Sequence, residues 1–384
     1  MDFDAIVVHY GEIGVKGRNR FVFEKILMNN IKNLLGNFET EVYKRYGRIV
    51  CRPKFKEEAT IRKALEAVPG IEYFAFAFSS ELSFDRIQEK AIKLLNDKEF
   101  ATFKVEARRS NKSFPLNSFE INNRLGASIA SILNKSVSMK PDIKLYVEIC
   151  EKEAFLYTEK CRGLGGLPVG SSGKVVSLIS GGIDSPVASF FMMKRGCNVV
   201  FVHFYNRIIN SERAISKLEK VVSVLTKFQL KSKLYIIPFE KLQMEVVKGV
   251  PSKYRMIIYR RAMDRVANVV AQIEGAKALI TGDSLGQVAS QTLENLNVIH
   301  EASNIQVFTP LIGLDKVEIV NIAKKIGTYE YSILPYQDCC SFMLSPHPVT
   351  RSCLEEVKKL EANIKFNPKE YLEGSRTLEF KYKF

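Results

Sequence analysis

The sequence predicts two regions of different fold class: an α+β region first, and then a doubly wound α/β domain built on a parallel sheet. Before residue 160, helical and strand patterns alternate and end in a pair of strands. After residue 174, the strands are short and fully apolar, and helical segments separate them. Strands that are apolar on both faces need helices above and below them, as in a parallel sheet. A glycine-rich stretch without periodicity, CRGLGGLPVGSSGK at 161–174, separates the two regions.

The first region begins with a strand at 3–9 and a helix at 19–35, which has apolar residues at helical spacing and ends at Gly36. Two strands at 41–46 and 48–51 form a predicted hairpin around Gly47. The rest alternates between helices expected at 57–68, 84–95 and 119–133 and strands expected at 71–79, 102–107, 143–150 and 154–158.

The second region has apolar strands expected at 175–179, 198–204, 233–237 and 278–281. A helix is expected at 211–228, where the apolar positions fall on one face. In open parallel sheets, ligands bind at the carboxyl ends of the strands. We therefore look for a binding site in the turns that follow these strands.

Composition indicates a cytosolic protein with a basic surface. The 384 residues exceed one ordinary core, so two or three domains are expected. No secretory signal and no apolar run of membrane-spanning length is visible, so we expect no membrane association. Lys and Arg number 57 against 42 Asp and Glu, a net charge of +15, which suits nucleic acid or is simply a basic solvated surface. Seven cysteines, an odd number, argue against a disulfide framework.

The stretch VVSLISGGIDSPVAS at 175–189 joins an apolar strand to a helix through two glycines and a carboxylate. Gly181 and Gly182 permit a sharp turn and a close approach of the backbone to a ligand. The amides and the helix N-terminus attract an anion such as phosphate. No Gly-Lys-Ser/Thr follows, so the turn is not a Walker loop, and a tight turn without a ligand is the alternative.

Two further turns lie where such a fold binds nucleotides. VFVHFY at 200–205 ends the next strand, where a base could dock. ALITGDSLGQVASQTLEN at 278–295 contains Gly282, which can let a ligand approach the backbone, and Gln291, whose amide can donate and accept. Each is a weak signal alone.

Four stretches in this order resemble the ThiI family, the tRNA 4-thiouridine synthetases. They are HYGEIGVKGRNR (9–20), SLISGGIDSPVA (177–188), TGDSLGQVASQT (281–292) and PYQDCC (335–340). The resemblance covers essentially the whole chain. It implies a ferredoxin-like domain at 1–54, a THUMP RNA-binding domain at 55–162, a linker at 163–173 and a PP-loop ATP pyrophosphatase domain at 174–384. The implied reaction adenylates the 4-carbonyl of uridine at position 8 of tRNA and replaces its oxygen with sulfur.

The resemblance also implies an ATP site, with Mg²⁺ expected to accompany the ATP and no protein-held metal. Asp184 is the expected catalytic carboxylate. Arg260 stands where the family often has Lys, and it lies in a basic helix with Arg255, Arg261 and Arg265, a face more typical of solvent or RNA contact. The expected ATP-binding residues are Leu178, Ile179, Ser180, Gly181, Gly182, Asp184, Ser185, His203, Phe204, Arg260, Gly282 and Gln291.

Cys339 is the implied catalytic cysteine, which carries a persulfide, and Cys340 is its close competitor or the resolving thiol. A buried cysteine pair is the structural alternative, and the spacing to Cys353 fits no zinc template. Some family members carry a C-terminal rhodanese domain. The chain as given ends at Phe384 without one, so we expect a separate cysteine desulfurase or other persulfide donor, and a role in thiamine synthesis is doubtful. Cys353, Cys197 or an external thiol are other candidates for the resolving role.

Two basic clusters are the expected RNA contacts, since phosphate contacts supply affinity and shape guides the recognition of folded RNA. Ordinary solvated surface is the alternative for each, and a homodimer is left open. The residues are Lys16, Arg18 and Arg20 in the first cluster and Lys104, Arg108, Arg109 and Lys112 in the second.

Three rival functions remain at this point. A PP-loop ligase for a small molecule would explain 175–292 but leave the first 160 residues and Cys339 without a role. A non-catalytic RNA-binding protein would not need the intact Ser-Gly-Gly-x-Asp-Ser sequence. A 2-thiouridine enzyme would usually lack this N-terminal half.

Overall fold

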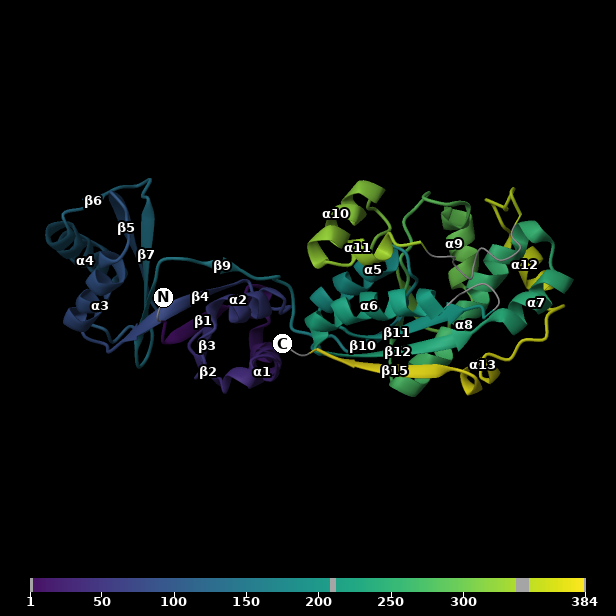
Figure 1. Cartoon of the computed structure of the whole chain (residues 1–384), viewed down its shortest axis with the longest axis horizontal. Helices are drawn as coiled ribbons and strands as arrows, with labels where there is room; N and C mark the ends of the chain where they lie inside the picture. The colour runs from purple at the N-terminus through teal and green to yellow at the C-terminus, as the bar shows by residue number, and fades with distance from the viewer. Residues whose placement is uncertain (1–2, 208–211, 336–344, 383–384) are drawn as a thin grey trace. The chain divides into compact units, whose positions relative to one another are not determined.

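The computed structural model describes residues 3–207, 212–335 and 345–382. It forms two compact units, one ending at Pro168 and one beginning at Val169. Figure 1 labels their helices and strands. The division lies inside the glycine-rich stretch at 163–173, which the sequence suggests as a linker. Each unit is described by itself.

Unit 1 contains one large mixed sheet with helices against it. The strand order is β2-β3-β1-β4-β8-β7-β5-β6, and β9 pairs with β4. The strands are β1 (Ala5–His9), β2 (Glu41–Arg45), β3 (Arg48–Arg52), β4 (Tyr73–Ser80), β5 (Thr102–Arg109), β6 (Ser136–Val137), β7 (Ile143–Ile149), β8 (Ala154–Tyr157) and β9 (Cys161–Arg162). The α-helices are α1 (Arg20–Leu34), α2 (Glu58–Glu66), α3 (Phe84–Asn96) and α4 (Ser118–Leu133).

Strand β4 connects the two halves of this sheet. Its first part, Tyr73–Ala77, pairs with β1, and its last part, Phe78–Ser80, pairs with β8. One apolar core lies where α3 and α4 pack with strands β5, β7 and β8, and it includes Ile87, Phe103 and Leu125. The boundary that the sequence suggests at 54–55 lies between β3 and α2, before this shared strand.

Unit 2 is the doubly wound domain that the sequence predicts. Its sheet has the order β14-β13-β10-β11-β12-β15, in which every neighbouring pair is parallel except β12 and β15. The strands are β10 (Lys174–Leu178), β11 (Asn198–Tyr205), β12 (Lys231–Pro238), β13 (Ala278–Ile280), β14 (Gln306–Phe308) and β15 (Arg376–Lys381). The α-helices are α5 (Asp184–Lys194), α6 (Glu212–Gln229), α7 (Glu240–Gly249), α8 (Arg255–Glu274), α9 (Leu293–His300), α10 (Lys316–Ile326), α11 (Tyr329–Ser332), α12 (Leu354–Glu361) and α13 (Glu370–Glu373).

The edge strand β15 is not anticipated from the sequence. Its residues RTLEFK are exposed or half-buried, so they form no apolar run. It runs antiparallel to β12, as edge strands of otherwise parallel sheets often do. This strand is defined by its pairing with β12, because a strand that is not buried has no apolar pattern by which its sequence could reveal it.

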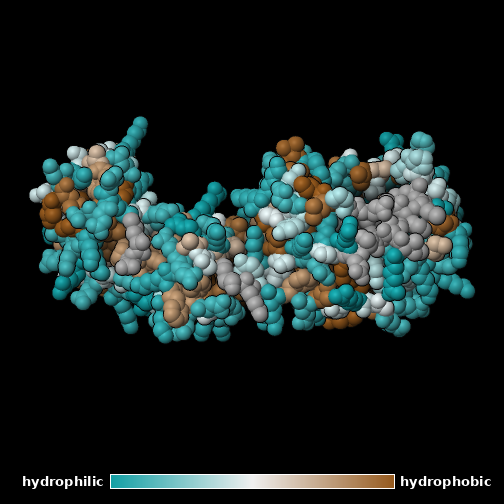
Figure 2. Space-filling model, in the orientation of Figure 1, coloured by the Kyte–Doolittle hydropathy of each residue, from teal (hydrophilic) through white to brown (hydrophobic). Residues whose placement is uncertain are grey.

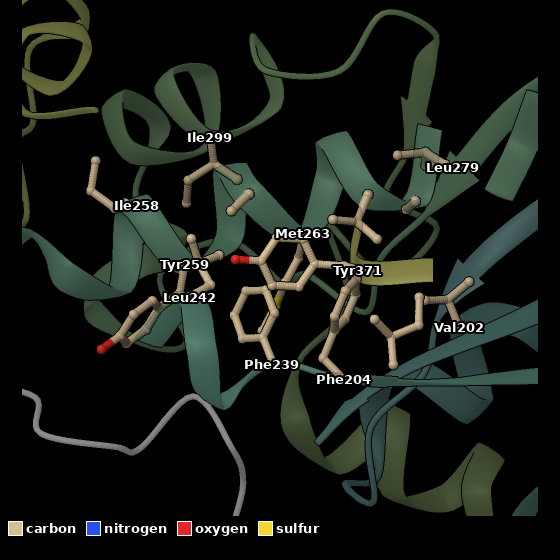
Figure 3. Close-up of a cluster of buried hydrophobic side chains, with 14 of the residues drawn as sticks. Val202, Phe204, Phe239, Leu242, Ile258, Tyr259, Met263, Leu279, Ile299 and Tyr371 are labelled. Carbon is tan, nitrogen blue, oxygen red and sulfur yellow. The ribbon is translucent and has the colours of Figure 1, made fainter. Parts of the chain in front are cut away.

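Helix α8 carries the main core of unit 2. Figure 3 shows Tyr259 and Met263 of this helix gathered with Val202 and Phe204 of the sheet. The ring centroids of Phe204 and Phe239 lie 5.0 Å apart. This packing holds α8 against the carboxyl half of the sheet. Among the helices in the described parts of the chain, none is long and apolar enough to cross a bilayer.

Candidate active site

The turn after β10 is closed by its own hydrogen bonds. The backbone N–H of Ser180 donates to Ser185 Oγ at 2.8 Å, and the two Oγ atoms lie 3.2 Å apart. The N–H of Gly182 donates to Ser180 Oγ at 3.2 Å. Helix α5 begins at Asp184, so its N-terminus lies in the same turn. The sequence Ser-Gly-Gly-x-Asp-Ser thus builds a preformed loop at a carboxyl edge, suited to an anion.

Gly282 packs directly on this loop. A Cβ at this position would lie 2.6 Å from the backbone N of Ser185 and 2.9 Å from the carbonyl carbon of Asp184. We expected from the sequence that Gly282 would give a ligand access to the backbone. In the structure, the backbone of the loop at 180–185 packs against Gly282, so this glycine also allows the two turns to pack closely.

A cavity of about 250 Å³ opens beside this loop. It brings together every expected ATP-binding residue except Gly181 and Gly182, which lie in the loop itself. His203 is 3% exposed, and its Nδ1 lies 2.8 Å from the carbonyl oxygen of Ile179. The cavity is lined by Leu178, Ile179, Ser180, Asp184, Ser185, Val202, His203, Phe204, Met256, Arg260, Met263, Asp264, Thr281, Gly282, Asp283, Ser290 and Gln291.

Asp184 is held by two side chains that the sequence does not single out. Lys316 Nζ lies 2.6 Å from Asp184 Oδ1, and Gln287 Nε2 donates to Oδ2 at 3.0 Å. Lys316 is the first residue of α10, and its side chain is about half exposed. A positive charge therefore stands beside the phosphate loop, contributed by a helix far along the chain.

Asp283 is the centre of a buried polar network in the cavity wall. It is 3% exposed and accepts hydrogen bonds from Arg260 Nη2 at 2.6 Å, Thr281 Oγ1 at 2.6 Å and Gln291 Nε2 at 3.0 Å. Burial alone would raise the pKa of this carboxyl. The charge of Arg260 and the hydrogen bonds hold it well below its usual range. Asp283 thus stays ionised and positions two cavity residues.

His300 extends this network. Its Nε2 lies 3.4 Å from Asp283 Oδ2, and its Nδ1 lies 3.1 Å from Asp264 Oδ2. Burial would lower the pKa of His300, but the two carboxylates raise it from 6.5 to about 9. Asp283 lies in the stretch TGDSLGQVASQT, but it is not among the residues that the family resemblance implies for the ATP site. Asp264 and His300 lie on different helices, and no local pattern links them.

The sequence suggests that the basic face of helix α8 contacts solvent or RNA. For Arg260 and Arg261 this expectation is wrong. Arg261 is fully buried and pairs with Glu361 at 2.8 Å and Glu301 at 3.0 Å. Arg260 lines the cavity instead. Arg265 also pairs with Glu361, at 2.8 Å. Distant acidic residues neutralise this face, which a local charge count does not reveal.

In the first basic cluster, the three side chains differ in their exposure and in their contacts within unit 1. Arg18 is exposed. Lys16 lies over the ring of Phe23, 5.3 Å from its centroid. Arg20 donates to Glu24 Oε1 at 2.8 Å and to the hydroxyl of Tyr10 at 2.6 Å. Arg20 therefore belongs partly to the fold of unit 1.

The second cluster divides in the same way. Arg108 and Lys112 are exposed, and Lys104 is half-buried. Arg109 donates to the carbonyl oxygens of Phe114 at 2.9 Å and Leu116 at 3.2 Å. Arg109 thus fastens the loop after β5. Figure 2 shows hydrophilic side chains over most of the visible face of unit 1.

Cys339 and Cys340 lie outside the described residues. Cys353 is exposed at the start of α12, whereas Cys197 is buried and burial raises the pKa of its thiol. Cys51, Cys150 and Cys161 are buried as well. Within residues 3–207, 212–335 and 345–382, no cluster of His, Cys, Asp and Glu could hold a metal ion.

Family models match three parts of the chain. The model described as thiamine biosynthesis protein (ThiI) matches residues 170–366. The ThiI ferredoxin-like domain matches residues 5–75, and the THUMP domain matches residues 81–159. Together they cover both units.

Relatives and solved structures agree with these matches. The chain is 43% identical to the probable tRNA sulfurtransferase of Thermoanaerobacter sp. (strain X514), and the match covers 97% of each chain. It is 42% identical to the probable tRNA sulfurtransferase of Acetivibrio thermocellus, over 94% of each. A solved 4-thiouridine synthetase, in complex with RNA and with bound ATP, superposes with a TM-score of 0.89 at 38% identity, covering 99% of this chain and 100% of that one. The structure of PH1313 from Pyrococcus horikoshii Ot3 has a TM-score of 0.67 at 29% identity, covering 84% and 99%.

Proposed function

The chain belongs to the ThiI family, and we propose that its cavity binds the ATP with which it activates a uracil carbonyl of tRNA for replacement by sulfur. The protein is a tRNA sulfurtransferase that forms 4-thiouridine and converts ATP to AMP and diphosphate. The observation that carries this function is the preformed loop at 180–185 beside the cavity, in a chain that superposes on a 4-thiouridine synthetase with bound ATP. The small-molecule ligase and the non-catalytic RNA-binding protein are disfavoured, since neither explains the match over both units.

The loop would hold the phosphates of ATP. Backbone N–H groups of the turn and the N-terminus of α5 supply donors and partial positive charge to an anion. Lys316 adds a full positive charge near Asp184. The 4-oxygen of the uracil attacks the α-phosphorus, and diphosphate leaves toward this positive end of the site. Preorganised charge of this kind stabilises the transition state without reorganisation.

Asp184 also fits the Mg²⁺ that is expected with ATP. Mg²⁺ favours one or two carboxylates together with substrate phosphates, and Asp184 presents a carboxylate at the phosphate loop. When bound, the ion would neutralise phosphate charge. The side chains of Lys316 and Gln287 would keep the Asp184 carboxylate oriented.

The sulfur step is assigned to Cys339. The outer sulfur of a persulfide on Cys339 attacks C4 of the adenylated uracil, and AMP leaves with the former carbonyl oxygen. A second thiol then breaks the sulfur–sulfur bond, which leaves a disulfide and 4-thiouridine. Cys340, Cys353 or an external thiol could supply it. Cys197 is a poor candidate, because it is buried and burial raises its pKa.

Unit 1 contributes the tRNA contact, through the exposed Arg18, Arg108 and Lys112 above all. A cysteine desulfurase or another persulfide protein is the proposed sulfur donor. The proposed place of action is the cytoplasm, where tRNA is used. The family description also names thiamine biosynthesis.

The proposed function is tested by following AMP release and thionucleoside formation in the same reaction. The wild type should release AMP only with tRNA, and mass spectrometry should detect 4-thiouridine when a desulfurase supplies sulfur. Asp184→Ala should abolish both products. Cys339→Ser should still release AMP but form no 4-thiouridine, while Cys340→Ser should lose less or stop after one turnover. AMP release without tRNA would instead favour the small-molecule ligase, and 4-thiouridine from Cys339→Ser at the wild-type rate would reassign the sulfur step to Cys340.

A further inference from the structure

His300 lies behind the cavity wall and between two buried carboxylates. It is the last residue of α9. Its Nδ1 is hydrogen-bonded to Asp264 at 3.1 Å, whereas its Nε2 faces Asp283 at 3.4 Å as a charge contact without a hydrogen bond. Asp264 is 1% exposed, and Asp283 is 3% exposed. Two buried carboxylates in one network need compensating positive charge, since an unpaired buried charge is strongly destabilising.

The carboxylate of Asp283 connects His300 to the cavity. The oxygen atom nearest to His300, Oδ2, also accepts from Arg260 and Thr281, while Oδ1 accepts from Gln291. Arg260 and Gln291 line the cavity, and Gln291 Oε1 is buried with no hydrogen-bond partner in the described structure. A buried acceptor without a partner costs free energy unless a bound molecule donates to it. The hydrogen bond from Gln291 Nε2 to Asp283 fixes the orientation of the Gln291 amide. Its Oε1 is thereby left to accept from a bound donor, such as an exocyclic amine or a ribose hydroxyl.

We propose that His300 is a positioning residue for ATP, and that its ring, held by Asp264, keeps Asp283 in the orientation that holds Arg260 and Gln291 at the cavity wall. This inference rests on the proposed ATP site. His300 does not line the cavity, so it acts through Asp283 and not by touching the nucleotide. Through this network a histidine at the end of α9 would influence a site built by β10, β11 and β13.

Charge balance is the physical basis. The charged groups that face His300 are Asp264 and Arg260 from α8 and Asp283 from the turn after β13. Next to it on the chain, Glu301 pairs with Arg261 and Lys358 instead. Burial raises the pKa of Asp264, and the protonated His300 opposes this rise, so His300 favours the ionised form of Asp264. Two positive groups then face two negative ones. Loss of the His300 proton leaves Asp264 and Asp283 facing a single arginine, and Arg260 then has to divide its interaction between them.

The test measures ATP affinity by calorimetry without tRNA, together with melting temperature. His300→Gln should weaken ATP binding about tenfold, which is about 1.4 kcal/mol. The double variant Asp264→Asn/His300→Gln removes one charge of each sign, so it isolates the effect of charge balance and should bind ATP more tightly than His300→Gln alone. His9→Gln is the matched control, because His9 is also paired with a buried carboxylate, Glu148, but in unit 1. It should lower the melting temperature and leave ATP affinity unchanged.

A pH series separates positioning from a purely structural role. Wild-type ATP affinity should be constant from pH 6.5 to 8 and fall as the pH rises through about 9, where His300 loses its proton. The double variant should lack this fall, and it supplies the measurement even if His300→Gln alone does not fold. Equal ATP affinity in wild type and both His300 variants across this range would overturn the inference. Failure of the wild type to bind ATP would instead refute the proposed function.

Discussion

Each unit contains a buried charge cluster in which carboxylates contact an arginine and a histidine, but the two clusters lie at different places in their sheets. The Glu148 cluster of unit 1 joins Glu148 to His9, Arg48 and Tyr157. The Asp283 cluster of unit 2 consists of Arg260, Asp264, Asp283 and His300. Glu148 and the two carboxylates of the Asp283 cluster are each no more than 3% exposed, and each cluster contains one arginine and one histidine.

Position in the sheet separates the two clusters. Glu148 lies within β7, and its partners come from β1, β3 and β8 of the same sheet. The partners His9 and Arg48 belong to the part matched as ferredoxin-like, and Tyr157 belongs to the part matched as THUMP. Asp283 lies instead in a turn after a parallel strand, where it lines a cavity. The Glu148 cluster therefore connects the two matched domains of unit 1, whereas the Asp283 cluster lies at the carboxyl edge of the sheet, where ligands of such folds bind.

The largest expected effect is on the stability of unit 1. Glu148→Gln leaves Arg48 buried without a compensating charge, which should cost about 3 to 5 kcal/mol in free energy of unfolding. Hydrogen exchange of β1, β3 and β7 measures this loss, and ATP affinity should not change. Glu151→Gln is the control, because Glu151 is exposed two residues beyond the end of β7. A comparable loss of ATP affinity in Glu148→Gln would remove the distinction between the clusters.

The corresponding change in unit 2 should appear in catalysis. Asp283→Asn keeps the size of the side chain but loses the charge that holds Arg260 and Gln291. AMP formation should fall about 100-fold, the loss typical of groups misplaced by an ångström. The measurement is kcat/KM for ATP with saturating tRNA. If Asp283→Asn melts early but keeps wild-type kcat/KM, then the Asp283 cluster is structural like its counterpart.

A smaller effect is expected where the cavity meets the phosphate loop. Gly282→Ala places a methyl group 2.6 Å from the backbone N of Ser185, so the loop has to shift. ATP affinity should fall about tenfold. Gly313→Ala in the same unit is the control, because nothing lies within 4 Å of its added Cβ. Equal affinity in both variants would show that the loop adapts at no cost.

The two clusters should also fail at opposite ends of the pH range. Burial opposes ionisation of Glu148, but His9 and Arg48 lower its pKa from 4.5 to about 2. Its contribution is therefore present above pH 4.5 and is lost as the pH falls through 2. The pKa of His300 is raised from 6.5 to about 9, so its contribution is complete below pH 6.5 and is lost as the pH rises through 9. Hydrogen exchange in each unit over both ranges checks this, and loss of both units at the same pH would contradict it.

Local patterns account for what could be predicted. The helices and most strands follow from apolar periodicity, and the loop at 180–185 follows from two glycines between a strand and a helix. The cavity residues were expected from the resemblance to the ThiI family, while the rule that ligands bind at the carboxyl ends of parallel strands pointed only to the turns that follow those strands. Strand β15 was missed because it is an exposed edge with no apolar run. Arg109 was expected to contact RNA, yet it fastens a loop through carbonyl oxygens, which carry no signature in the sequence.

The sequence by itself determined the order of most elements, the loop at 180–185 and the resemblance to the family, because each depends on patterns or motifs that are local along the chain. Only the tertiary structure decided which charges meet. Arg261 is buried because Glu301 and Glu361 reach it from two other helices or their ends, and Arg260, its neighbour, faces the cavity because a one-residue step turns an α-helix by about 100°. His300 acquires its role from Asp264 and Asp283, which come from elsewhere in unit 2. Electrostatic pairing depends on distance in space, and packing alone sets that distance.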